Sequence, residues 1–404
     1  MTTTPRTRTA LAAALTALPL IAAAQDGSDR PWFVGASQEL RWESNAQNSS
    51  TNETSDTVSA TTLFGGANAR LGRQRVRGDL ALTHTAYRRV SDRDTDGWRG
   101  GVALDWETVG RLSGTVSARS QKQQAEPNVG GAQQSSVSNV ERSDELQARA
   151  RLGGAALLVI EGGVGKRRVE FSAPELAYRG YTQDSVDAGV SWRPSDLLTL
   201  SLGASGAESE YREPAPGDIV ADDSKRRSID VGVRWVPSGV STFNARLSAT
   251  REEYTRATAQ DFSGLTGFVS WGWRPTGKLS VTTTLARDTG QELSYMRDEE
   301  TARITATDFA RVSNRLSVVA GYELTGKIGM TGALTYARRS LVDVISGASG
   351  DDNTTSLEVG ARWAATRTVA VGCSVGYTSR SASGVGSSDY DNTSAGCLVS
   401  VTID

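Results

Sequence analysis

The chain is poor in several residue types, and each shortage excludes a class of protein. It has one histidine, two cysteines and only 10 prolines among 404 residues. The one histidine and the two cysteines form no cluster with metal-ligand spacing, and no GxSxG, Walker or dinucleotide-binding motif stands between an expected strand and helix. Glycine, in contrast, is abundant at 42 residues. Together with the scarcity of proline, this is not the composition of a generic disordered chain.

Long apolar runs and an excess of one charge are also missing. Hydrophobic residues make up 38% of the chain and the mean hydropathy is −0.36. Beyond residue 24 no stretch approaches the ~18 consecutive apolar residues of a membrane-spanning helix. The 44 basic and 46 acidic residues give a formal net charge of −2. This balance argues against nucleic acid as a partner, because phosphate binding needs a positive excess or a basic stripe.

The first residues have the pattern of an export signal. MTTTPRTRTALAAALTALPLIAAAQ places Arg6 and Arg8 before an apolar run from Ala10 to Ala24 that ends in small residues. The pattern predicts a secretory signal peptide over residues 1–24, cut after Ala24, and an exported domain over residues 25–404. A membrane anchor is the alternative, but the run is short and ends in an Ala-x-Ala site.

Hydrophobicity alternates with a period of two through most of the chain. In SIDVGVRW (228–235) Ile229, Val231, Val233 and Trp235 share one face, and SVDAGVSWR (185–193) and SLEVGARW (356–363) repeat the pattern. The alternating segments run roughly ten to fourteen residues, longer than a typical ~5–6-residue strand and long enough to cross a membrane at a tilt. They predict an all-β fold, a transmembrane antiparallel up-and-down β-barrel whose apolar face meets lipid and whose polar face lines a watery interior.

Tryptophan recurs at one place in this pattern, the last outward position before a short turn. Because an indole ring prefers the lipid–water boundary, these residues predict one half of an aromatic girdle. A row of core tryptophans in a soluble repetitive sheet is the alternative. The girdle residues are Trp106, Trp192, Trp235, Trp273 and Trp363. Aromatic residues near the other strand ends suggest the opposite rim: Tyr87, Tyr211, Tyr254, Tyr336 and Tyr377.

Connection lengths alternate between short and long. Short turns are expected at 194–196, 237–239 and 275–277, and long polar loops at 43–56, 122–140, 211–224, 291–311, 341–354 and 381–391. Counting hairpins predicts about 18 strands, with 16 as the alternative. The count is least certain over 291–324, where RITATDFARV is either a strand or part of a long loop. The loop is favoured, because Thr325–Lys327 should lie with the short turns.

The residue types that carry chemistry are few. His84 shares its parity with Leu80 and Leu82, which places it on the lipid-facing side near the outer rim rather than beside a nucleophile. The chain is therefore expected not to be an enzyme and to need no cofactor or metal. Cys373 and Cys397 fall on the lipid-facing side of the last two expected strands. They could form a cross-strand disulfide in an oxidising compartment, or remain two free thiols.

Ionic residues with polar-face parity are the candidates for lining the lumen. They could form a solute-selecting ring, but mutual neutralisation that solvates and stiffens the wall is the favoured interpretation. Their mixed signs argue against a strong preference for anions or cations. The acidic pairs at 222–223 and 351–352 could hold divalent cations near lipopolysaccharide, although solvated loop charge is the simpler account. The lumen candidates are Glu39, Arg41, Asp105, Asp187, Arg193, Asp230, Arg234, Glu358 and Arg362.

Three stretches carry a resemblance to a known group. They are FVGASQELRWESNAQNSS, the WRPSDLLTLSLGAS type of hairpin, and YELTGKIGMTGALTYARRS. Over residues 31–404 the chain resembles the outer-membrane β-barrel porins of Gram-negative bacteria that are associated with exopolysaccharide-biosynthesis clusters. The resemblance implies a bacterial outer-membrane location and no catalytic residues.

The expected function is a passive pore that passes a hydrophilic solute or assists export of an exopolysaccharide. A non-conducting structural or adhesion barrel, binding matrix polysaccharide or a partner through its long outer loops, is the alternative from another class. A soluble periplasmic β-protein is a third interpretation. The expected partners are outer-membrane lipid and lipopolysaccharide, with polysaccharide or export machinery as further candidates.

Overall fold

The computed structural model describes residues 31–125, 139–154, 157–174, 177, 180–211, 223–255, 261–289, 310–342, 349–384 and 388–404. The predicted signal peptide therefore lies outside the described residues. Within them, no helix is both long enough and apolar enough to cross a membrane.

Eighteen strands account for most of this chain, and their lengths follow the alternating segments of the sequence. The strands are β1 (Trp32–Glu43), β2 (Asp56–Leu71), β3 (Gln74–Tyr87), β4 (Thr95–Glu107), β5 (Leu112–Gln124), β6 (Val140–Leu152), β7 (Leu158–Phe171), β8 (Tyr181–Ser195), β9 (Leu198–Tyr211), β10 (Ser224–Ser238), β11 (Ser241–Tyr254), β12 (Phe262–Trp273), β13 (Leu279–Asp288), β14 (Ala310–Glu323), β15 (Ile328–Val342), β16 (Ser349–Ala364), β17 (Val369–Gly384) and β18 (Tyr390–Ile403). A 3-10 turn, η2 (Ser91–Arg93), lies between β3 and β4.

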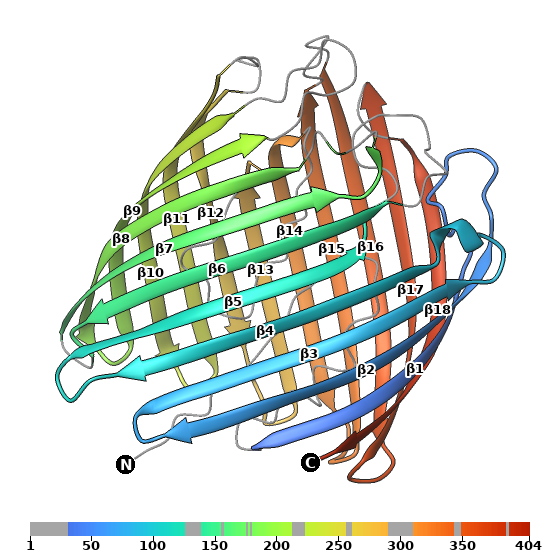
Figure 1. Ribbon diagram of the computed structural model, residues 1–404, viewed down its shortest axis with the longest axis horizontal. Helices are drawn as coiled ribbons and strands as arrows, with labels where there is room; N and C mark the ends of the chain where they lie inside the picture. The colour runs from blue at the N-terminus through green and yellow to red at the C-terminus, as the bar shows by residue number, and fades with distance from the viewer. Residues whose placement is uncertain are drawn as a thin grey trace.

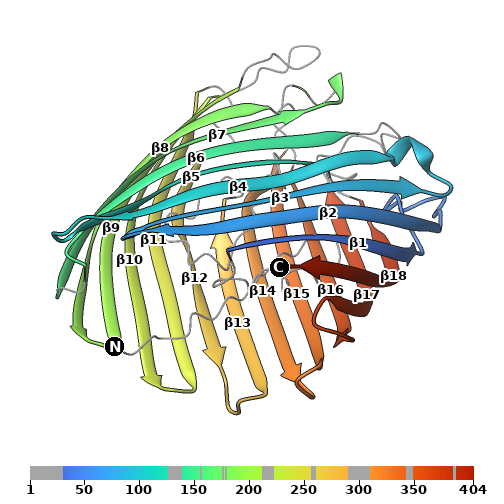
Figure 2. The same ribbon diagram turned by 60° about the horizontal axis from the view of Figure 1, so that its bottom comes forward.

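The strands form one closed antiparallel barrel. Each strand pairs with its neighbours in sequence, and β1 closes the wall by pairing with β18 from Val34↔Ile403 to Glu43↔Ser394. Figure 1 shows the blue first strand beside the red last strand, and the turned view in Figure 2 shows the same neighbours. Closure gives every strand a hydrogen-bonded neighbour on both sides, which a span through lipid requires. The prediction of 18 strands is confirmed, and the alternative of 16 is wrong.

The wall is a single layer whose two faces differ in polarity. Apolar side chains point outward and stay exposed, as Val231 (52% exposed) and Val359 (50%) illustrate. The residues that alternate with them face the lumen and are mostly polar. On β10, for example, Ser228 and Asp230 are buried between exposed Ile229 and Val231. Because no second layer formed by the described residues covers the apolar face, lipid is the medium that can bury it.

The two ends of the barrel have different connections. At one end lie short turns such as 196–197, 239–240 and 324–327, together with the C-terminus (Figure 1). At the other end the connections are longer, for example 44–55 and 125–139. This is the asymmetry of outer-membrane barrels, whose short turns face the periplasm. Thr325–Lys327 is a short turn as expected, and of RITATDFARV only the last residues, from Ala310, lie among those described.

Two of the predicted short turns were placed too early. Pro194 and Pro237 do not lie in turns but inside β8 and β10, where the pairing register shifts between Trp192 and Ser195 and between Trp235 and Ser238. Each shift adds one residue to the longer strand, which is a β-bulge. A bulge tolerates proline because the extra residue makes no ladder hydrogen bond there.

The five predicted girdle tryptophans lie at the short-turn end, on the outward positions of their strands. Trp192, Trp235 and Trp363 are about half exposed, at 46%, 47% and 52%. Trp106 is less exposed because its ring lies over Gly114, where an added Cβ would come within 2.5 Å of the indole. Their contact with the lipid boundary stays a prediction.

A stack of rings extends this girdle on one side of the barrel. Trp235, Phe243, Trp271 and Trp273 follow one another across β10, β11 and β12 with ring centroids 5.6, 5.9 and 5.8 Å apart. The opposite rim differs from the expectation. Tyr336 and Tyr377 are exposed on the outer face, at 42% and 45%. Tyr87, Tyr211 and Tyr254 alternate with outward residues on their strands and so face inward, because strand parity reverses the face at every residue.

Candidate functional site: the inner wall of the barrel

The inner wall is the surface that a solute would meet. All nine predicted lumen residues lie on strands, at positions that alternate with the exposed apolar side chains: Glu39, Arg41, Asp105, Asp187, Arg193, Asp230, Arg234, Glu358 and Arg362. Whether a solute contacts them stays a prediction. The structure shows the ion pairs and hydrogen bonds that several of them form.

On β1 three of the inward positions form a charged cluster. Arg41 Nε lies 2.8 Å from Glu43 Oε1, and Arg41 Nη1 lies 3.2 Å from Glu39 Oε1. The three side chains are only 10–16% exposed. Gly396 on the neighbouring β18 makes room, because a Cβ there would come within 3.0 Å of the Arg41 Cβ. The cluster carries two negative charges and one positive charge at the seam where the barrel closes.

A second ion pair crosses a whole strand. Arg149 on β6 and Asp187 on β8 approach to 3.1 Å over the intervening β7. The strand between them carries Gly163, and a Cβ at that position would come within 2.6 Å of an Asp187 carboxylate oxygen. Glycine is therefore needed there for the guanidinium and the carboxylate to meet. Close by, Arg151 pairs with Glu161 at 3.1 Å.

The wall of β3, β4 and β5 is rich in arginine. Asp105 accepts a hydrogen bond from Thr115 at 2.8 Å and pairs with Arg77 at 3.3 Å. Asp79 lies two residues after Arg77 on β3 and has Arg99, Arg119 and Arg77 as its electrostatic neighbours. Arg77 also pairs with Asp105, and Glu145 lies opposite Arg119 in the β5–β6 pairing. The cations here that are exposed to the lumen are therefore Arg99 and Arg119.

The remaining predicted residues are distributed along the wall. Asp230 accepts hydrogen bonds from Ser248 on β11 and from Ser205 on β9 (3.4 Å), so its partners come from neighbouring strands rather than from its own. Arg193 and Arg234 are exposed near the short turns, and Arg193 Nη1 donates to the Gly154 carbonyl at 3.4 Å. On β16, Glu358 lies within electrostatic reach of Glu39 on β1.

Several members of these clusters were not predicted. Arg149 and Arg77 have the right parity on their strands and could have been found by extending the alternation count to QARARL and QRVRGDL. Glu43 continues the alternation of Glu39 and Arg41 in ELRWE. Arg339 and Asp352 form another inner pair at 2.5–2.8 Å, with the Asp352 side chain fully buried. Asp352 is thus an ion-pair partner in a strand and not a solvated loop charge.

Other predicted chemistry lies away from the inner wall. A disulfide joins Cys373 and Cys397, which face each other across β17 and β18 on the outer face. His84 Nδ1 lies 2.8 Å from Asp96 on the outside of the barrel, where both side chains are exposed. Among the described residues, no group of three or more His, Cys, Asp or Glu side chains could hold a metal ion. Position 222 of the other acidic pair lies outside the described residues.

Comparisons with known proteins show the fold. No family model matches the chain, and no curated protein matches it. Among solved structures it is similar to Pseudomonas aeruginosa OpdK with vanillate, at 13% identity and a TM-score of 0.50, covering 92% of this chain and 98% of that one. It is also similar to Pseudomonas aeruginosa OccK2 (OpdF) in complex with glucuronate, at 11% identity and a TM-score of 0.51, covering 93% and 98%. The chain therefore has the closed 18-stranded antiparallel barrel fold of outer-membrane porins.

Proposed function

We propose that the chain is an outer-membrane porin that passively passes small hydrophilic solutes. The observation that carries this proposal is the closed 18-stranded wall with an apolar outer face and an ionised inner face. At this strand number, wall side chains alone do not fill the interior, so an aqueous path is expected. No observation calls for an energy source, and passive diffusion is the simplest mechanism.

Within this function, small carboxylate solutes are the favoured class. Arg99 and Arg119 expose guanidinium groups to the lumen, with Asp79 and Glu145 as neighbouring carboxylates. Guanidinium groups bind carboxylates with paired, charge-assisted hydrogen bonds. The two similar structures with ligands in their names hold vanillate and glucuronate, which are both carboxylates. The preference should be modest, because elsewhere on the wall arginines and acidic residues neutralise each other.

Export of an exopolysaccharide, which the sequence resemblance suggested, has no support from these comparisons. The bound molecules named in the similar structures are small. A non-conducting adhesion barrel is the rival from another class, and its long loops lie partly outside the described residues.

Planar-bilayer recordings test the proposal. Purified protein should give reproducible open steps, and a salt gradient should give a zero-current potential that indicates a mild preference for anions. Liposome swelling should be faster with glucuronate than with glucose. Silent bilayers with a folded protein would contradict a pore and favour the adhesion barrel.

The variant Arg99→Gln/Arg119→Gln tests the solute class. It should lose most of the anion preference while still opening, because it removes two charges from the lumen without changing the wall. Lys166→Gln/Arg168→Gln, which removes two charges from the outer face, is the matched control and should keep the preference. Equal loss in both variants would show that overall charge, not the arginine patch, sets selectivity.

A further inference from the structure

The outer face of β4 to β8 changes from apolar to charged in four successive rows of paired residues. The first row, Leu104, Val116, Ala148, Val164 and Val186, is entirely apolar. The next rows toward the long-loop end introduce Lys166 and Asp184, then Asp144 and Arg168, and finally Trp98, Lys122, Arg142 and Glu170. Since the short turns face the periplasm, this boundary lies at the outer leaflet.

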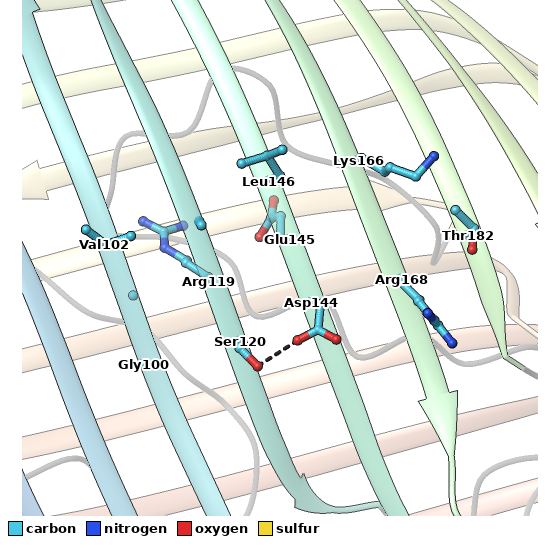
Figure 3. Close-up of a pocket in the computed structure, with 12 residues that line it drawn as sticks. Gly100, Val102, Arg119, Ser120, Asp144, Glu145, Leu146, Lys166, Arg168 and Thr182 are labelled. Atoms are coloured by element: carbon cyan, nitrogen blue, oxygen red, sulfur yellow. Dashed lines mark hydrogen bonds between the residues drawn. The ribbon is translucent and has the colours of Figure 1, made fainter.

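A groove of about 570 Å³ lies on this boundary. It exists because small residues, Gly100, Ala118 and Ser120, sit between bulkier neighbours. Val102, Ala118 and Leu146 form its apolar part. Figure 3 shows Val102 on one side, Lys166 and Arg168 on the other, and Ser120 donating to Asp144 between them.

The cations around the groove are available to a ligand. Lys166 is 58% exposed and pairs with the equally exposed Asp184 at 2.9 Å, and the Arg168 side chain is 44% exposed. Exposed pairs of this kind contribute little stability, so a stronger anion can replace the carboxylate partner at small cost. In the last row, Lys122 and Arg142 make cation–π contacts with the Trp98 ring, at 5.4 and 5.7 Å from its centroid. This ring fixes two more cations at the rim.

We propose that this outer groove binds lipid A, the phosphorylated glycolipid of lipopolysaccharide. An acyl chain lies along Val102, Ala118 and Leu146, and a phosphate of the sugar meets Lys166 and Arg168. Val102, Ala118, Leu146 and Lys166 follow one another in one row, and Arg168 lies in the next row toward the long-loop end. The arrangement therefore fits an amphiphile whose anionic group adjoins its acyl chains. The proposal depends on the outer-membrane location but not on whether the barrel conducts.

Binding can be measured with the full-length folded protein in detergent, by native mass spectrometry and by competition with a fluorescent lipid A. Diphosphoryl lipid A should bind more tightly than its dephosphorylated form. Lys166→Gln/Arg168→Gln should weaken binding by roughly tenfold or more, since each cation near an anionic lipid surface contributes substantially to attraction. Ala118→Phe fills the apolar part of the groove without changing charge, and it should also weaken binding.

The matched control is Lys225→Gln/Arg251→Gln, which removes two similarly exposed cations, 59% and 70%, from the outer face of β10 and β11. It should bind lipid A as the unchanged protein does. Equal losses in this control would overturn the proposal, because the whole charged belt would then attract the lipid. Unchanged binding by folded Ala118→Phe, or equal affinity for the dephosphorylated lipid, would overturn it too. So would a dimer that the groove variants dissociate, which would assign the face to a second copy of the chain.

Discussion

Gly163 is the residue at which a single added methyl group should disturb the inner wall most directly. In Gly163→Ala the new Cβ would come within 2.6 Å of an Asp187 oxygen and push the carboxylate away from Arg149. We expect a loss of about 1–3 kcal/mol in the free energy of unfolding, since both charges stay partly buried after the pair opens. Unfolding by guanidinium in detergent measures it.

The neighbouring glycine provides the control for this prediction. In Gly162→Ala, on the outer face of the same strand, the Cβ would meet only the Asp187 carbonyl at an ordinary 3.5 Å. This variant should be close to neutral. If both variants unfold alike, the methyl acts through backbone propensity and the ion pair contributes nothing measurable.

The disulfide between Cys373 and Cys397 can be tested chemically in the purified protein. The intact protein should gain two hydrogens in mass on reduction, and neither thiol should react with an alkylating reagent in denaturant before reduction. Cys373→Ala/Cys397→Ala should lower stability by roughly 1–3 kcal/mol, because the bond closes a chain separation of only 24 residues. Alkylation without reductant would show that the purified protein holds free thiols.

Individual residues were predictable only in part. The parity of Arg41, Asp187 and Asp230 can be counted within one strand, so their assignment to the inner face needed no structure. Their partners could not be counted in this way. The contact of Asp187 with Arg149 depends on the register of three strands and on the absence of a side chain at Gly163. Register depends on how two segments pair, and the sequence of one segment alone predicts it only weakly.

At the scale of elements, a threonine recurs in the short turns. In TGKL, TGKI and TRTV the hydroxyl of Thr276, Thr325 or Thr366 accepts hydrogen bonds from the backbone N–H groups two and three residues later, at 2.9–3.3 Å. Thr325→Val removes the acceptor and keeps the shape. It should cost about 1 kcal/mol of stability and slow formation of the β14–β15 hairpin.

Thr325→Ser, which retains the hydroxyl, is the matched control and should behave much like the unchanged protein. Stability is measured by unfolding in detergent, and hairpin formation by the rate at which heat-resistant barrel appears in lipid vesicles. A valine variant as stable as the unchanged protein would show that these hydrogen bonds contribute nothing measurable.

The strands themselves were predictable because alternation is a local signal that persists over many residues. Their ends were harder to place. Proline after tryptophan suggested a turn at 194 and at 237, whereas the chain accommodates each proline in a bulge and turns two residues later. The inward tyrosines show the same difficulty. Near a strand end, one residue decides which face a side chain occupies, and composition carries no information about that residue.

For the whole molecule, everything depends on which face of the wall is in contact with lipid. Val231 lies at the middle of β10 and is 52% exposed on the apolar face. If acyl chains surround it, Val231→Arg should destabilise the folded barrel in lipid by about 2–4 kcal/mol. Val240, in the turn after the same strand and 44% exposed, lies beyond the apolar band, and Val240→Arg should cost much less. Reversible folding into phospholipid vesicles measures both variants. Equal costs would mean that Val231 is not in a membrane, and the pore and the lipid A groove would both have to be abandoned.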